Sequence, residues 1–123
     1  MKIIVLKFGG TSVGTINKIK KVAEIIGDYR KKNYKVIVVS SAMSGVTNDL
    51  LKKSEEISEN FCDSEQDVLV SSGEQVACSL IAGRLIHKGF KSRSWLSWQI
   101  PILANGPYKN ARIWIRLRGL PKS

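Results

Sequence analysis

The sequence has few of the residues that build disulfide, zinc or redox sites. Its 123 residues contain two cysteines, Cys62 and Cys78, and one histidine, His87. A zinc site needs three or four clustered ligands, and this count and spacing match neither such a site nor a disulfide framework. We therefore expect reduced thiols and no resident metal, with His87 as an ordinary residue at the end of an amphipathic helix.

Long apolar runs are also missing. No stretch approaches the roughly 20 apolar residues of a membrane span. The apolar run that starts at Ile3 is interrupted at Lys7, well short of the roughly 7–15 residues of a secretory signal. With 43% hydrophobic and 24% charged residues, the composition excludes a disordered tail or a collagen-like fibre. These features predict a cytoplasmic globular chain of about one domain's length.

Acidic residues are absent from the last 49 positions. Residues 1–74 carry eleven Lys and Arg against ten Asp and Glu, whereas residues 75–123 carry nine Lys and Arg and no acid. Most of the net charge of +10 therefore lies in the second segment. Such a separation predicts either contact with an anionic partner such as nucleic acid, or a domain whose acidic counterpart lies elsewhere.

The pattern of apolar residues predicts an α/β fold. Runs rich in Ile and Val at 2–8 and 36–39 are typical of strands buried on both faces. Apolar residues at three- and four-residue intervals predict an amphipathic helix over about 15–32, with Thr15 as its N-cap. Each strand is followed by a loop of small residues and a helix, the second helix beginning near Thr47. This order predicts a parallel sheet.

The middle of the sequence is less regular. Residues 52–67 predict the end of a helix and a surface loop, and residues 66–88 predict a long helical segment that Gly89 ends. Gly73 and Gly83 argue against a single unbroken helix there.

Strand character returns at residues 90–103. Trp95, Trp98 and the following isoleucines alternate there until Pro101 interrupts the pattern. Beyond a turn at 105–107, the chain becomes irregular and basic.

The first loop has the parts of a phosphate site. It follows a strand of a parallel sheet, at the edge where ligands bind, and it combines glycines, backbone N–H donors and a following helix N-terminus with a lysine. It is not a P-loop, because the lysine precedes the glycines. A tight turn with an extended lysine would give the same pattern. The candidate phosphate-binding residues are Lys7, Phe8, Gly9, Gly10, Thr11 and Ser12.

The second loop and a later glutamate are the other candidate site elements. Ser41 to Thr47 offers hydroxyls and amides but no nucleophile paired with a base, since His87 is the only histidine. Glu74 is the last carboxylate in the chain and follows a glycine at a predicted helix break. It is either a group that projects into a cleft to pair with a substrate ammonium, or a solvated glutamate on a helix surface.

Four stretches together resemble the aspartokinases of the amino acid kinase superfamily. They are Lys7-Phe8-Gly9-Gly10-Thr11-Ser12-Val13, the run from Val38 to Asn48, Ser72-Gly73-Glu74-Gln75, and Arg93 to Ile102 continuing at 111–113. Their order and spacing also agree, and the similarity extends to about residue 113.

The resemblance implies a three-layer αβα sandwich with a mainly parallel sheet, here incomplete. It also implies ATP-dependent phosphorylation of the β-carboxylate of L-aspartate, the entry to lysine, diaminopimelate, threonine and methionine. ATP with Mg²⁺ is the implied co-substrate and aspartate the substrate, with no tightly bound cofactor and no membrane partner.

The resemblance further implies residue roles. Lys7 would be the catalytic residue that neutralises charge on the transferring phosphoryl group, which Gly9 and Gly10 would hold through backbone N–H groups. The implied aspartate-binding residues are Ser41, Thr47 and, for the α-ammonium, Glu74.

Two departures qualify these expectations. Ala104-Asn105 stands where the family usually has Thr-Asp, and residues 114–123 form an unmatched basic tail. Residues 1–113 correspond to the aspartate- and phosphate-binding half of a kinase domain, without the second half or the ACT regulatory domains.

Three hypotheses for the function follow. The first is an aspartokinase that acts as a homo-oligomer or with a chain supplying the rest. The second is an inactive remnant or split-gene product, and the third is a basic nucleic-acid-binding module without a recognised motif.

Overall fold

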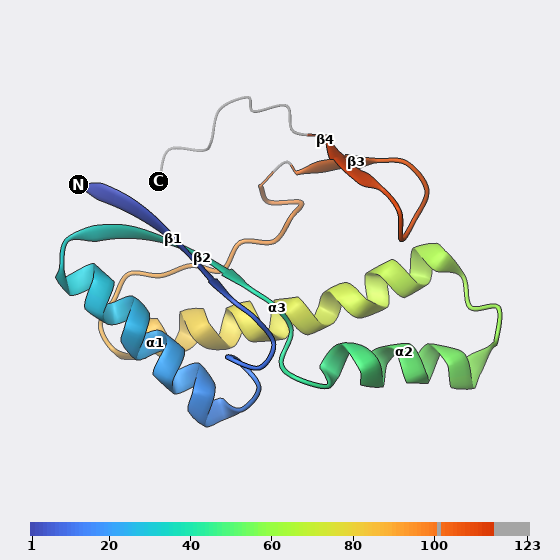
Figure 1. Cartoon of the computed structure of the whole chain (residues 1–123), viewed down its shortest axis with the longest axis horizontal. Coiled ribbons are helices and arrows are strands. Elements are labelled where there is room, and N and C mark those ends of the chain that lie inside the picture. The colour runs from blue at the N-terminus through green and yellow to red at the C-terminus, as the bar shows by residue number, and fades with distance from the viewer. Residues whose placement is uncertain (101, 115–123) are drawn as a thin grey trace.

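The computed structural model describes residues 1–100 and 102–114. These residues form three helices, a two-stranded parallel sheet and a short antiparallel hairpin (Figure 1). In chain order the elements are β1 (Lys2–Phe8), α1 (Ile16–Lys31), β2 (Tyr34–Ser40), α2 (Val46–Ile57), α3 (Asp63–His87), β3 (Leu103–Asn105) and β4 (Arg112–Trp114).

The parallel pairing of β1 with β2 confirms the predicted α/β class. The register runs from Lys2 opposite Tyr34 to Phe8 opposite Ser40. Since both strands end at the same level, the two small-residue loops leave the same edge of the sheet. This arrangement places the first and second loops side by side.

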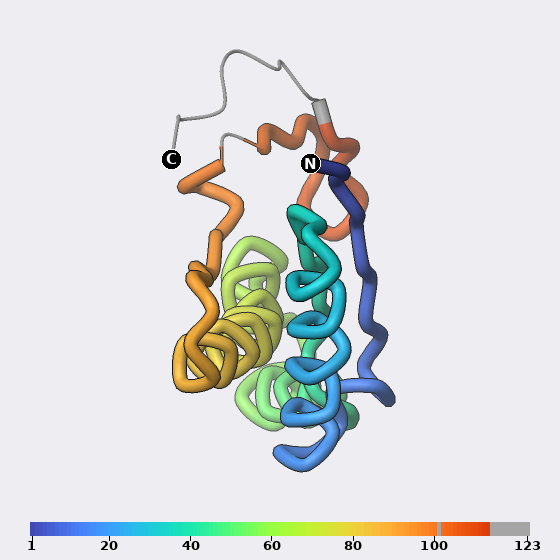
Figure 2. Tube along the Cα trace, turned by 90° about the vertical axis from the view of Figure 1, so that its left-hand side faces the viewer, coloured from blue at the N-terminus to red at the C-terminus, as the bar shows by residue number. Residues whose placement is uncertain are grey.

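One hydrophobic core lies between the sheet and two helices. Helices α1 and α3 pack on the same face of the sheet, with α1 between β1 and α3 in the side view (Figure 2). The buried cluster consists of Val13, Ile19, Val22, Ala23, Ile26, Ile81 and Leu85, against which Leu6, Phe8, Val36 and Val38 are packed.

The opposite face of the sheet is open, which corrects the prediction of strands buried on both faces. Ile3, Val5, Ile37 and Val39 point to this face and are between 49% and 64% exposed. In Figure 2, β1 runs along the outside of the molecule with no element beyond it. The described residues therefore provide two layers of the expected sandwich, because both covering helices lie on one side.

Helix α1 begins as predicted. The Thr15 hydroxyl accepts a hydrogen bond from the backbone N–H of Lys18 at 3.2 Å, which satisfies one of the unpaired donors of the first turn. Arg30 and Lys31 lie in the last turn, where positive charge is favourable against the helix dipole.

The long helix α3 is unbroken, so the predicted interruption at Gly73 is wrong. Glycine allows close packing there, since a Cβ would lie 3.0 Å from Ala42 Cβ and 3.1 Å from Val46 Cγ1. The helix also begins at Asp63, inside the segment predicted as loop. It ends at His87, and Gly89 follows with φ of 84°, in agreement with the predicted stop signal.

The strand predicted over 90–103 is present only at its end. Residues 97–100 form a turn, in which the N–H groups of Gln99 and Ile100 donate to the carbonyl of Leu96. The Gln99 side chain closes this turn by accepting from the Leu96 N–H at 3.0 Å. These local hydrogen bonds replace the ladder that the alternating pattern predicted. Pro101 and the tail beyond residue 114 lie outside the described residues.

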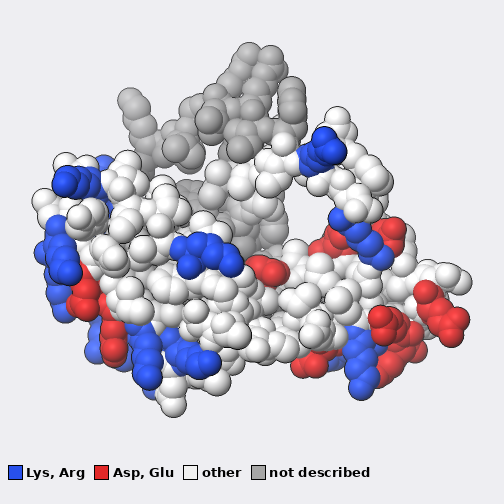
Figure 3. All heavy atoms as spheres, in the orientation of Figure 1, with Lys and Arg blue, Asp and Glu red and all other residues white. Residues whose placement is uncertain are grey.

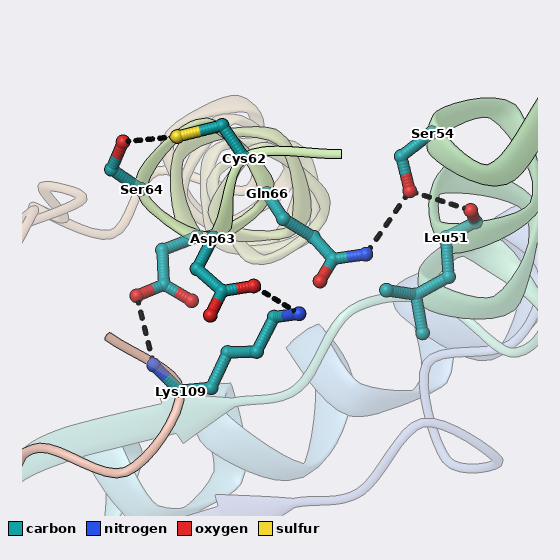
Figure 4. A network of polar contacts seen from close by, with 8 residues as sticks. Leu51, Ser54, Cys62, Asp63, Ser64, Gln66 and Lys109 are labelled. Atoms are coloured by element: carbon teal, nitrogen blue, oxygen red, sulfur yellow. Dashed lines mark hydrogen bonds and ion pairs between the residues drawn. The ribbon is translucent and has the colours of Figure 1, made fainter. Parts of the chain in front are cut away.

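The β3–β4 hairpin is attached to the first turns of α3. Lys109, in the hairpin loop, places its ammonium 2.6 Å from a carboxylate oxygen of Asp63, and its backbone N–H donates to Asp67 at 3.2 Å (Figure 4). Gln66 on the same helix donates to the buried hydroxyl of Ser54 on α2. A basic residue of the second half of the chain is thus held by acidic residues of the first half.

Candidate active site

The first loop is a closed turn fixed to the core. The N–H groups of Ser12 and Val13 donate to the carbonyl of Gly9 at 3.0 and 3.3 Å, and the Val13 side chain is fully buried. Within the described part of the chain, the N–H groups of Gly10 and Thr11 donate to no protein acceptor. They remain available to an anionic ligand.

Lys7 supplies the positive charge of this loop. Its ammonium lies 3.7 Å from the point where a Cβ on Gly9 would stand, and its side chain is exposed on the open face of the sheet. A full positive charge and two free N–H groups therefore lie at the same turn, which is the arrangement that binds phosphoryl oxygens.

The second loop contacts the first directly. The Ser41 N–H donates to the carbonyl of Phe8 at 3.0 Å, and a Cβ on Gly10 would lie 3.2 Å from the carbonyl oxygen of Ala42. Ser41 and Thr47 are both half-buried, Thr47 in the first turn of α2. The structure thus brings Ser41 and the α2 N-terminus beside the predicted phosphate loop.

Glu74 is less closely associated with this group. It is exposed on α3, next to the glycine whose close packing brings α3 against Ala42 and Val46. In residues 1–100 and 102–114 it makes no hydrogen bond or ion pair. Its helix turn therefore lies against the second loop, and its carboxylate is free to take a cationic group.

Two lysines of α1 extend the site beyond the sequence prediction. An open hollow of about 390 Å³ lies beside the first loop, and Lys18 and Lys21 line it together with Thr11, Ser12 and Phe8. The Lys18 ammonium donates to the Thr11 carbonyl at 3.0 Å and so supports the loop. The signal in the sequence was a pair of lysines three residues apart just after a glycine loop.

Other kinds of site are not formed by the residues that the structure describes. No three His, Cys, Asp or Glu side chains gather there as metal ligands. Within the same residues, no helix is long and apolar enough to cross a membrane.

The comparison with protein families decides the assignment. The profile of the amino acid kinase family matches residues 2–117. The chain belongs to the amino acid kinase family. An aspartokinase of Rickettsia felis is 47% identical to it over 116 residues, which are 92% of this chain and 29% of that protein. An aspartate kinase of Stutzerimonas stutzeri is 45% identical over 113 residues, 92% of this chain and 27% of that protein.

A solved structure supports the same fold. The crystal structure of aspartate kinase from Synechocystis matches with a TM-score of 0.68 and 42% sequence identity, over 70% of this chain and 15% of that chain. The α/β amino acid kinase fold predicted from the sequence, incomplete in extent, is thereby confirmed. This family member spans less than a third of the length of the curated relatives given above.

The contact between the two loops of this amino acid kinase family member can be tested at its glycines. We expect Gly10→Ala to lower the free energy of unfolding by about 1–3 kcal/mol, because the new methyl group meets a backbone carbonyl that must move. Gly9→Ala is the matched control, since its methyl group would meet only Lys7 Nζ at an ordinary 3.7 Å. Urea denaturation followed by circular dichroism measures both, and equal losses would contradict the described loop contact.

The two thiols are expected to differ in reactivity. The Ser64 hydroxyl, 3.1 Å from the exposed Cys62 sulfur, and nearby backbone N–H groups lower the pKa of Cys62, whereas burial raises the pKa of Cys78. A lower pKa gives more thiolate at neutral pH, so iodoacetamide should modify Cys62 about tenfold faster or more. Peptide mass spectrometry over time measures the rates. Ser64→Ala should slow Cys62 and Ser72→Ala should not; equal rates in both variants would contradict this.

Proposed function

We propose that the chain is the aspartate- and phosphate-binding part of an aspartate kinase, which transfers the γ-phosphoryl group of ATP to the β-carboxylate of L-aspartate. The observation that carries the proposal is the Lys7 ammonium beside the glycine turn, where the Gly10 and Thr11 N–H groups are free. The names of the relatives, which are 45–47% identical, support the choice of aspartate as substrate.

The proposed reaction joins two anions. A β-carboxylate oxygen of aspartate attacks the γ-phosphorus, the bond from phosphorus to the bridging oxygen of ADP breaks, and 4-phospho-L-aspartate forms. Such a transfer depends on positioning and charge neutralisation more than on covalent chemistry. Lys7 reduces the repulsion between the two anions, and the N–H groups of Gly10 and Thr11 hold the phosphoryl oxygens. Mg²⁺ enters with ATP.

The second loop and α3 hold aspartate in this scheme. The hydroxyls of Ser41 and Thr47 donate to its carboxylates, beside the phosphate loop that the Ser41 N–H contacts. Glu74 accepts from its α-ammonium. The product is the acyl phosphate from which lysine, diaminopimelate, threonine and methionine are made.

Hydroxylamine trapping tests the proposal, because it converts the acyl phosphate into a coloured hydroxamate. We expect ATP- and aspartate-dependent product when the chain is mixed with the part of the Rickettsia felis aspartokinase that lies beyond the matched stretch, and none from either polypeptide alone. A complex of the two that forms no hydroxamate, while the intact Rickettsia felis enzyme does so in the same buffer, would contradict the proposed activity.

The role of Glu74 predicts a binding defect. In the complemented enzyme, Glu74→Gln should raise the KM for aspartate about 10–100-fold with a small change in kcat, because the α-ammonium loses a charged acceptor. Glu65→Gln, another exposed glutamate of α3, is the control and should leave both constants unchanged. An unaltered KM in Glu74→Gln would remove Glu74 from the aspartate site.

A further inference from the structure

The first turn of α1 carries a lysine at a place where positive charge is unfavourable. Lys18 is the third residue of this helix, and no acidic residue stands in the same turn. The helix dipole opposes a cation at this end by about 0.3–1 kcal/mol. The surroundings are already basic, since Lys and Arg predominate over α1 whereas Asp and Glu gather from the end of α2 to the start of α3 (Figure 3). Local rules are broken in this way mainly at functional positions.

Lys18 is tied to the first loop through a specific contact. Its backbone N–H donates to the Thr15 hydroxyl at 3.2 Å, and its ammonium donates to the Thr11 carbonyl at 3.0 Å. Long side chains of a helix point back toward its N-terminus, so this reach follows from the position of Lys18 in the first turn. Lys21 lines the same hollow but makes no hydrogen bond within residues 1–100 and 102–114.

The Thr11 carbonyl is the start of a chain of hydrogen bonds. It shares a peptide group with the Ser12 N–H, which donates to the Gly9 carbonyl at 3.0 Å. The Gly9 carbonyl shares the next peptide group of this chain with the Gly10 N–H, which has no acceptor among the described residues. The chain therefore leads from the Lys18 ammonium to an N–H group that is free to meet a phosphoryl oxygen.

The hydrogen bonds of this chain all polarise the backbone in one direction. A carbonyl that accepts a hydrogen bond makes the N–H of the same peptide group a stronger donor, so successive bonds reinforce one another. The full charge of Lys18 stands at the carbonyl end of the chain, and the free Gly10 N–H stands at the other end. The Gly9 carbonyl also accepts from Val13 at 3.3 Å, which adds to the same polarity.

The contact with Lys18 also fixes which side of the turn the carbonyl oxygens face. A Cβ on Gly14 would lie 3.3 Å from the Gly10 oxygen and 3.4 Å from the Thr11 oxygen, so both oxygens face Gly14. A carbonyl oxygen that turned toward a phosphoryl group would repel it. Because Lys18 holds the Thr11 oxygen, it stabilises the orientation in which N–H groups and not carbonyls are offered to an anion.

We propose that Lys18 is a positioning residue of the phosphate loop. It acts through the peptide groups between Gly9 and Ser12, and it orients and strengthens the Gly10 N–H as a donor to the phosphoryl group of ATP. The proposal rests on the proposed function, since it states how the same site holds its phosphoryl group. Lys18 touches no reacting atom in this scheme, because its charge reaches the phosphoryl group through the backbone.

Amide hydrogen exchange of the full chain, followed by NMR, tests the relay without any substrate. In Lys18→Met the Ser12 N–H should exchange about 3–10-fold faster, because its bond to Gly9 loses cooperative support. Lys18→Arg keeps a cationic donor and should restore the protection of the parent. Lys20→Met, at an exposed lysine of the same helix, is the control and should exchange like the parent.

Kinetics of the complemented enzyme, with the Rickettsia felis part as partner, test the effect on the phosphoryl group. Lys18→Met should raise the KM for ATP about 3–10-fold and leave the KM for aspartate unchanged. The circular dichroism spectrum should also stay the same, since the Thr15 cap is retained. A merely structural role would lower the amount of active enzyme and would not separate the two substrates. Lys18→Arg should recover the affinity for ATP, and Lys20→Met should match the parent.

Two results would overturn the role of Lys18: equal Ser12 exchange in Lys18→Met and Lys20→Met, or an unchanged KM for ATP in Lys18→Met. The outcomes separate this role from the proposed function. Faster Ser12 exchange in Lys18→Met, together with no hydroxamate from the complemented parent, would support the relay and refute the activity alone. Normal hydroxamate formation with unchanged Ser12 exchange would refute the relay alone.

Discussion

Replacing Lys7 with alanine is expected to lower the kcat of the complemented kinase about 10²–10³-fold, with little change in the KM for aspartate. The Lys7 ammonium lies directly at the glycine turn, 3.7 Å from the point where a Cβ on Gly9 would stand. In the proposed reaction the phosphoryl group moves between two anionic oxygens, and the Lys7 charge would stabilise that transition state more than bound aspartate. The loss of activity should therefore appear mainly in kcat and not in the KM for aspartate.

Steady-state hydroxamate assays at saturating partner measure this effect. Lys2→Ala is the matched control, because Lys2 is an exposed lysine at the other end of β1, away from the loop. It should keep the parent kcat. Direct titration of partner binding to Lys7→Ala shows whether any loss comes from assembly instead. A variant that binds its partner normally and turns over at the parent rate would remove Lys7 from the mechanism.

The first half of the fold could be predicted because its local signals agree. Apolar runs, a glycine loop, the Thr15 cap and a helical period all indicate one strand–helix–strand unit, and the structure has it with bounds shifted by one or two residues. The contact between the two loops also followed from the sequence, since parallel strands of equal register end at the same edge.

The wrong or missed predictions have three different physical causes. Gly73 was interpreted as a helix break, but it is a point of close approach between α3 and the second loop, and the sequence alone does not distinguish these uses. At 96–100, backbone hydrogen bonds within a turn outweigh the alternating pattern of Trp95 and Trp98. The attachment of Lys109 to Asp63 joins residues 46 positions apart, which no local pattern reports.

The open face of the sheet shows a different limit. The apolar pattern of β1 and β2 predicted cover on both faces, and the described residues cover one. Strands with this apolar pattern are most stable when both of their faces are covered. The two helices of the described residues that pack on the sheet cover one face.

The packing of α3 on α1 predicts the largest stability effect. Ile81 is 3% exposed in the core, whereas Ile86, five residues further along α3, is 57% exposed. We expect Ile81→Ala to lower the free energy of unfolding by about 2–5 kcal/mol and Ile86→Ala to change it by about 0.5 kcal/mol or less. Both substitutions remove the same atoms from the same helix, so the difference measures burial alone.

Urea denaturation followed by far-ultraviolet circular dichroism provides the comparison. A single domain is stable by only about 5–15 kcal/mol, and here the apolar side chains on one sheet face stay 49–64% exposed, so Ile81→Ala should raise the unfolded fraction at low urea. The partner should restore the helical signal of this variant, because a ligand of the folded state stabilises it by mass action. Equal losses in the two variants would show that α3 does not pack on α1 through the face that carries Ile81. The same result would contradict the packing of Val13, and with it the predicted phosphate loop, against this core.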